Sequence, residues 1–194
     1  MANLIIKPTS GGSLVLQDEG GDAALTVGTT GTVTIPDLSS GTAGVTENDR
    51  WVLTATVSAS GDITANLSRV TANGFTLLGT GMTIASGVFT FPSTGWWSIR
   101  WAFVTSVAAA DNVALGVRYY DGSNWDTRAL DAWVGNHASG TSATLGGARE
   151  ETIRIGALTE KVKFTVTSIS GATNIAGGTT NDQTSFTFTR LRGL

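Results

Sequence analysis

Residues 88–101 read VFTFPSTGWWSIRW, and this stretch decides how the fold is interpreted. Seven of its fourteen residues are Val, Ile, Phe or Trp, and the segment Pro-Ser-Thr-Gly divides it in the middle. Because an indole side chain is large, burying three of them requires a substantial core or a partner surface. The stretch predicts a strand, a turn and then a second, long strand that begins at Gly95.

The alternation within residues 95–106 separates two faces of this long strand. Successive side chains of a strand point to opposite sides of its sheet. The side chains expected to face the core are those of Trp97, Ile99, Trp101 and Phe103. Trp96 begins the opposite face, so one strand carries aromatic side chains on both of its sides.

The composition predicts a globular chain with few surface charges. Of the 194 residues, 41% are hydrophobic and 14% are charged, against about 25% charged in an average soluble domain. This favours a surface that is partly buried in an assembly over one that is merely polar and uncharged. The net charge of −3 and the lack of a Lys/Arg run argue against a nucleic-acid partner.

Several further classes are excluded or disfavoured by what the sequence lacks. The absence of cysteine excludes disulfides and cysteine-based zinc sites. No apolar run approaches the length of a membrane span, and no membrane partner is expected. The first ten residues, MANLIIKPTS, do not resemble a signal peptide, so we expect synthesis in a cytoplasm.

The chain reads as all-β with three parts. Short apolar runs alternate with Thr, Ser and Gly at period two throughout. We expect an N-terminal β arm at 1–35, a linker at 36–49 and a head domain at 50–194. The arm carries four strand-like runs, LIIKP, SLVLQ, ALTVG and TVTIP, whose anchoring side chains would be Leu4, Ile5, Ile6, Leu14, Val15 and Leu16.

An isolated sheet as small as the arm would be marginally stable in water. We therefore expect the arm to pair with other copies or to dock onto another protein, and packing on the chain's own head is the alternative. In the head, expected strands lie at 51–57, 63–70, 74–78, 82–84, 87–91, 95–106, 112–120, 124–134, 150–156, 161–168 and 184–191. That number suits a jelly-roll sandwich.

The spacing of Phe89, Pro92, Gly95, Trp96, Trp97 and Ile99 (F-x-x-P-x-x-G-W-W-x-I) resembles the signature of the C1q/TNF-like jelly roll. The segments 158–166 and 185–191 resemble two further strands of that family, although Glu160-Lys161 replaces Gly-Asp in the first and the second lacks a glycine. The resemblance covers roughly residues 50–194. It implies a ten-stranded jelly roll and a tight homotrimer. The aromatic residues assigned to the core or to the trimer contact are Phe89, Phe91, Trp96, Trp97, Trp101, Phe103, Phe164, Phe186 and Phe188.

Residues 3–35 resemble the repetitive β starts of bacteriophage structural proteins, especially those of fibres. Together the two resemblances imply a trimeric, non-enzymatic virion protein, made in the host cytoplasm and displayed on the virion surface. Its partners would be other copies of itself and another virion protein, such as the major capsid protein or a tail or fibre protein. The favoured role is a capsid decoration or cement protein that is attached by its N-terminal arm and stabilises the shell. The alternative is the receptor-binding tip of a tail or head fibre that recognises a host glycan.

The sequence offers little catalytic chemistry. The single histidine, His137, lies in the loop-like GNHASG, and no nucleophile elbow is present. Glu150 and Glu151 are neighbours in a strand and would point to opposite faces, unlike the facing pair of a glycosidase. No enzymatic activity and no cofactor are expected.

Two smaller features remain open at this point. Asp121, Asn124 and Asp126 are spaced somewhat like calcium ligands, but turn formation is favoured and no metal is expected. Trp125 and Trp133 lie in or near loop-like stretches and are candidates for stacking on a sugar. A buried core position is the favoured alternative for both.

Overall fold

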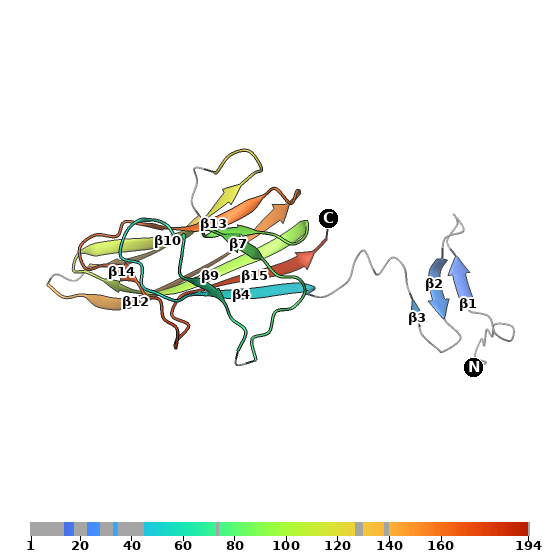
Figure 1. Ribbon diagram of the computed structural model, residues 1–194, viewed down its shortest axis with the longest axis horizontal. Coiled ribbons are helices and arrows are strands. Elements are labelled where there is room, and N and C mark those ends of the chain that lie inside the picture. The colour runs from blue at the N-terminus through green and yellow to red at the C-terminus, as the bar shows by residue number, and fades with distance from the viewer. Residues whose placement is uncertain are drawn as a thin grey trace, which may run out of the picture. The chain divides into compact units, whose positions relative to one another are not determined.

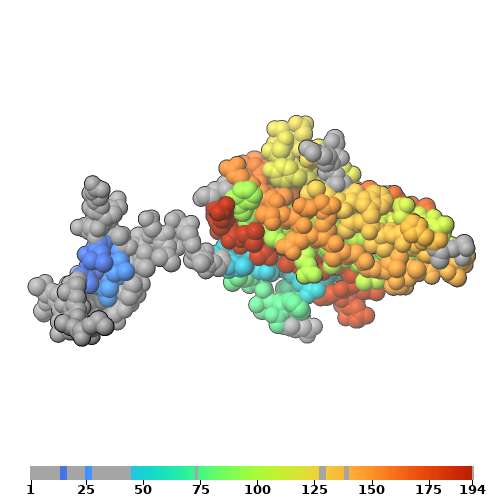
Figure 2. All heavy atoms as spheres, turned by 180° about the vertical axis from the view of Figure 1, so that it is seen from behind, coloured from blue at the N-terminus to red at the C-terminus, as the bar shows by residue number. Residues whose placement is uncertain are grey.

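The computed structural model describes residues 14–17, 23–27, 33–34, 45–72, 74–126, 130–137 and 140–193. The chain divides into two compact units, Met1–Gly44 and Val45–Leu194 (Figure 1, Figure 2). Among the described residues there is no helix, and hence none long and apolar enough to cross a membrane.

The first unit contains a three-stranded antiparallel sheet. Its strands are β1 (Leu14–Gln17), β2 (Ala23–Val27) and β3 (Val33–Thr34). They correspond to three of the four strand-like runs of the arm. The fourth run, with Leu4, Ile5 and Ile6, lies outside the described residues. Val15 and Leu16 are 42% and 48% exposed, so this sheet leaves apolar side chains open.

The second unit, the head, is a sandwich of two antiparallel sheets (Figure 1). The first sheet has the order β12-β9-β15-β4-β6, with β14 paired to β9. Its strands are β4 (Glu47–Leu53), β6 (Leu67–Arg69), β9 (Gly95–Val107), β12 (Ala143–Ile155), β14 (Asn174–Ile175) and β15 (Ser185–Arg192). The long strand expected after the Pro-Ser-Thr-Gly turn is β9, which lies between β12 and β15 in this sheet.

The second sheet of the head has the order β11-β10-β13-β8-β7, with β5 paired to β13. Its strands are β5 (Gly61–Asp62), β7 (Thr83–Ala85), β8 (Val88–Thr90), β10 (Asp111–Tyr120), β11 (Leu130–Asn136) and β13 (Lys161–Thr167). Each sheet interleaves strands that are distant in the sequence, which is the arrangement of a jelly roll rather than of a meander.

The core is an aromatic layer between the two sheets. Trp97, Ile99, Trp101 and Phe103 of β9 are at most 2% exposed, as the alternation of the sequence predicts. Phe164 of β13 packs on them from the other sheet, with its ring centroid 6.1 Å from that of Trp101 and 4.1 Å from that of Phe186.

Eight of the nine aromatic residues that the sequence assigns to the core or the trimer contact are buried within one chain. Their burial therefore needs no second copy. Trp96 is the exception, because it points away from the core and is only partly buried.

Some predicted boundaries are wrong. The head's first strand begins at Glu47, inside the expected linker, because Glu47 and Asp49 accept hydrogen bonds from backbone N–H groups of residues 80–82. The expected strand at 74–78 is absent except for a single bridge at Leu78. Where one strand was expected at 124–134, Trp125 forms an isolated bridge and β11 begins at Leu130.

Candidate binding surfaces

The outward side of the first sheet carries mostly short side chains. Cross-strand pairing aligns them in rows over β12, β9, β15 and β4. The three central rows are Ala148–Ala102–Ser185–Val52, Glu150–Arg100–Thr187–Arg50 and Thr152–Ser98–Thr189–Asn48. We call these twelve residues the small-residue face. Its charges are confined to the middle row, so the rows on either side of it are uncharged.

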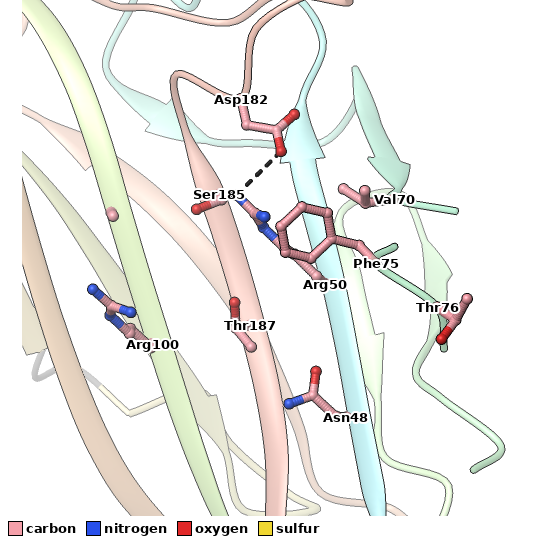
Figure 3. A pocket seen from close by; sticks show the side chains of 10 residues that line it. Asn48, Arg50, Val70, Phe75, Thr76, Arg100, Asp182, Ser185 and Thr187 are labelled. Carbon is pink, nitrogen blue, oxygen red and sulfur yellow. Dashed lines mark ion pairs between the residues drawn. The ribbon is translucent and has the colours of Figure 1, made fainter. Parts of the chain in front are cut away.

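A hollow of about 600 Å³ lies beside the middle row (Figure 3). Arg50 forms a 3.1 Å ion pair with Asp182, and its guanidinium lies 4.4 Å from the centroid of the Phe75 ring. Arg100 also lines the hollow and has no ion-pair partner among the described residues. The hollow thus joins an exposed aromatic ring to one neutralised and one unpaired arginine.

A second hollow, of about 380 Å³, lies on the outward side of the second sheet. Its lining residues are Ala85, Val88, Thr90, Tyr120, Trp125 and Lys161, and we call it the Trp125 groove. Lys161 occupies the middle of its floor, because it pairs with Tyr120 of β10 on one side and with Thr90 of β8 on the other.

A tight turn holds Trp125 at this groove. The Asp121 carboxylate accepts 2.7 Å hydrogen bonds from the N–H groups of Ser123 and Asn124, and these bonds lower the pKa of Asp121. Gly122 supplies the positive φ of +98° that this turn requires. The ring of Trp125 then lies 5.2 Å from that of Tyr120. The Asp121 carboxylate therefore closes a turn, which is the interpretation that the sequence favours for the spacing of Asp121, Asn124 and Asp126.

Lys163 covers the Trp125 ring and is itself neutralised. Its ammonium lies 4.2 Å from the centroid of the Trp125 ring and 2.7 Å from Oδ2 of Asp62. Thr165 donates a further 2.7 Å hydrogen bond to Oδ1 of Asp62. Burial raises the pKa of Asp62, but the bonds from Lys163 and Thr165 outweigh it and hold the pKa below its usual value. Lys161, in contrast, has no ion-pair partner among the described residues.

The two tryptophans proposed for sugar contact lie on the same outward side but do not form one site. Trp133 pairs with Ala114 and Trp125 with Tyr120 along the same strand, β10. Six residues of a strand correspond to about 20 Å. Trp133 is 57% exposed, so the favoured alternative of a buried core position is wrong for it. Trp133 lies on β11, which is the edge strand of the second sheet.

Nothing in the described parts of the chain assembles a recognisable catalytic centre. His137 is exposed directly after β11. Glu150 accepts a hydrogen bond from Ser98 on the outward side, whereas Glu151 pairs with Arg149 on the inward side. No group of three or more His, Asp or Glu residues that could hold a metal occurs among the described residues.

Sequence reasoning missed the other residues of the Trp125 groove. Tyr120 and Lys161 come from strands that are 40 residues apart in the sequence, and only the pairing of β10 with β13 brings them together. A signal for the lysines was nevertheless present. In KVKFTVT the apolar residues alternate with Lys161, Lys163 and Thr165, which places both lysines on the outward side.

No protein-family model and no curated protein matches the sequence. Solved structures do match. The structure of Eiger TNF from S. frugiperda gives a TM-score of 0.58 at 10% identity, covering 76% of this chain and 93% of that one. The crystal structure of murine APRIL at pH 5.0 gives a TM-score of 0.57 at 10% identity, covering 75% and 98%. These likenesses confirm the predicted TNF-like jelly-roll fold, and at this identity they show the fold alone.

Proposed function

We propose that the chain is a non-enzymatic, homotrimeric structural protein of a bacteriophage particle, which its N-terminal arm attaches to the capsid. The small-residue face carries this proposal. The jelly-roll resemblance implies a trimer, and this face has the properties that a contact between copies requires.

Short side chains make the small-residue face suited to close packing. Ala, Ser and Thr lose little rotamer freedom when a partner covers them, so ordering them on association is inexpensive. The partly exposed Trp96 adds an aromatic side chain beside this face. The middle row offers both signs of charge, Glu150 on one strand and Arg100 on the next, which lets two copies align with complementary charges.

The first unit supports the anchoring role. Its sheet of three short strands exposes Val15 and Leu16, and a sheet of this size is marginal alone. Docking onto another protein would remove these apolar side chains from water. A protein that binds the assembled capsid and not its separate subunits stabilises the capsid by mass action. The proposed site of action is therefore the outer surface of the virion.

The oligomeric state tests the first half of the proposal. Light scattering behind a sizing column should give three times the chain mass of 20.0 kDa for the full chain. Ala148→Glu places a charge in an uncharged row of the small-residue face and should yield monomers. Ala85→Glu introduces the same charge on exposed Ala85 of the second sheet and should leave the trimer intact. A monomeric wild-type chain would contradict the proposal.

The proposed capsid role is tested on assembled phage particles. Phage particles assembled without this chain should release DNA at a lower temperature, and adding the purified chain should restore the temperature of release. Attachment to the tail, seen by electron microscopy of gold-labelled particles, would instead favour the fibre alternative.

A second candidate function is a receptor-binding tip that recognises a host glycan. It is favoured by the exposure of Trp133 and by the preformed groove at Trp125, because aromatic side chains on a surface bind the apolar faces of sugars. Binding of an oligosaccharide to the purified trimer would support it.

A further inference from the structure

We propose that the Trp125 groove binds an acidic sugar, a pyranose that carries a carboxylate, with the ring against Trp125 and the carboxylate on Lys161. The inference deepens the second candidate function, the glycan-binding tip, and rests on it. It commits that function to one site and one class of sugar.

The walls of the Trp125 groove match the two sides of a pyranose. Ala85 and Val88 supply apolar surface next to Trp125, whereas Thr90 and Tyr120 supply hydroxyl groups that can donate to or accept from sugar hydroxyls. The volume of about 380 Å³ lies within the range of small-molecule sites. The groove therefore combines an aromatic platform with a few polar groups.

Trp125 is fixed before any ligand arrives. The turn closed by Asp121, the ring of Tyr120 at 5.2 Å and the ammonium of Lys163 at 4.2 Å all restrain its indole. A side chain that is already ordered loses little conformational entropy on binding, which increases affinity. A mobile surface tryptophan lacks this advantage.

The charge of the groove selects an anion. No carboxylate is among its lining residues, and Asp62, the acid that pairs with nearby Lys163, is already engaged by both Lys163 and Thr165. Lys161 lies between Tyr120 and Thr90 in the floor of the groove, and its ammonium has no ion-pair partner in the part of the chain that the structure describes. A sugar carboxylate would pair with the Lys161 ammonium and accept a charge-assisted hydrogen bond from it. The chain as a whole carries a net charge of −3, so the positive character is local to the groove.

Calorimetry of the full-length chain tests the inference with two trisaccharides. The first is trigalacturonate, and the second is the neutral galactotriose, which lacks the carboxylates. Trigalacturonate should bind, and Lys161→Gln should weaken it about tenfold, the effect of one charge-assisted hydrogen bond. Trp125→Ala should abolish binding. A matched control should bind as the wild type does: Arg154→Gln removes an exposed cation from the other sheet. Trp133→Ala, at the more exposed indole, shows which of the two tryptophans holds the sugar. Far-ultraviolet circular dichroism and melting curves establish that each variant is folded.

The outcomes separate this inference from the function on which it rests. If the neutral trisaccharide binds equally well and Lys161→Gln has no effect, the acidic-sugar inference is overturned while the glycan-binding tip survives. Binding that is lost in Trp133→Ala and kept in Trp125→Ala also overturns it, because the site then lies at the sheet edge. If neither trisaccharide binds, the inference is overturned as well, and a screen of other glycans decides whether the tip function remains.

Discussion

The indole nitrogen of Trp101 donates a 2.8 Å hydrogen bond to the backbone carbonyl of Leu115. Trp101 lies on β9 and Leu115 on β10, so this bond connects the two sheets through the core. Both residues are 0% exposed, and water cannot replace either partner. The tryptophan thus acts as a specific polar link between the sheets as well as an apolar filler.

Trp101→Phe should destabilise the head by about 2–4 kcal/mol, since it leaves a buried carbonyl without this donor and creates a cavity. The free energy of unfolding from urea titrations measures the change. Trp133→Phe makes the same substitution at an exposed site and should alter stability by less than about 0.5 kcal/mol. Equal effects of the two substitutions would mean that the cross-sheet bond contributes nothing.

Asp49 carries a deeply enclosed carboxylate, and the residue is 2% exposed. It accepts hydrogen bonds from Arg69 at 2.9 Å, from the indole of Trp51 at 2.9 Å and from the N–H of Met82 at 2.7 Å. One side chain therefore ties β4 to β6 and to the segment before β7.

Asp49→Asn should destabilise the head by about 2–4 kcal/mol, because it leaves the Arg69 charge without its partner and places an amide among donors. Asp182→Asn removes a carboxylate that is 40% exposed and paired with Arg50. This second change should have an effect of at most about 1 kcal/mol, as is usual for surface pairs. Chemical denaturation of both variants gives the comparison, and a similar loss in each would show that the burial of Asp49 has no consequence.

The β9 pattern illustrates what the sequence predicts well. Large residues at 97, 99, 101 and 103 alternate with smaller or polar ones, and all four are buried. The early start of β4 illustrates a feature that the sequence predicts poorly. A stretch rich in charge such as Glu-Asn-Asp-Arg reads as a linker, because its hydrogen-bond partners at 69 and 80–82 are invisible until the chain folds.

The length of β12 was underestimated for a similar reason. We expected a strand at 150–156, whereas β12 begins at Ala143 and runs through Gly146 and Gly147. Glycine usually weakens a strand, but here it fits a specific neighbour. A Cβ atom at Gly147 would lie 2.6 Å from the ring of Phe103 on the paired strand β9. The packing of Phe103 over the strand explains the glycine, and this contact cannot be read from either segment alone.

The hairpin between β7 and β8 depends on Gly87. Its two loop residues, Ser86 and Gly87, have φ values of +48° and +77°, the signs that a type I′ turn requires. A Cβ atom at Gly87 would lie 1.9 Å from the carbonyl oxygen of Ile63. The position therefore excludes a side chain for two independent reasons.

Gly87→Ala should destabilise the head by more than about 3 kcal/mol, since strain from positive φ alone accounts for about 1–2 kcal/mol. Gly74→Ala is the matched control, because Gly74 has a φ of +81° and no atom within 4 Å of the added Cβ. The Gly74→Ala variant should lose only the stability that the strain of the positive φ costs. Melting temperatures of the two variants test the prediction, and equal shifts would mean that the contact with Ile63 relaxes freely.

Asp111 connects the start of β10 to the loop before β14. It accepts hydrogen bonds from the hydroxyls of Thr173 and Ser170, and Thr173 in turn accepts the N–H of Ala108. The Thr173 hydroxyl, followed by the backbone N–H of Asn112, lowers the pKa of Asp111 below its ordinary value of 3.8. A carboxylate whose pKa is lower in the folded state stabilises the fold above its unfolded pKa and loses that effect as the pH falls through the folded value.

Asp111→Asn should therefore be less stable than the wild type at neutral pH, and the gap should close as the pH falls below the ordinary aspartate pKa of about 4.

Asp131→Asn should change the stability with the opposite sign. Burial raises the pKa of Asp131 despite the nearby Arg118 and Arg149, and its buried Oδ1 has no hydrogen-bond partner. Ionised Asp131 thus destabilises the fold above its raised pKa, so this variant should gain stability at neutral pH and lose the gain in acid. Urea midpoints of both variants and the wild type, measured from neutral pH into acid, test the two signs. If the two variants differ from the wild type with the same sign at neutral pH, the environments assigned to these carboxylates are incorrect.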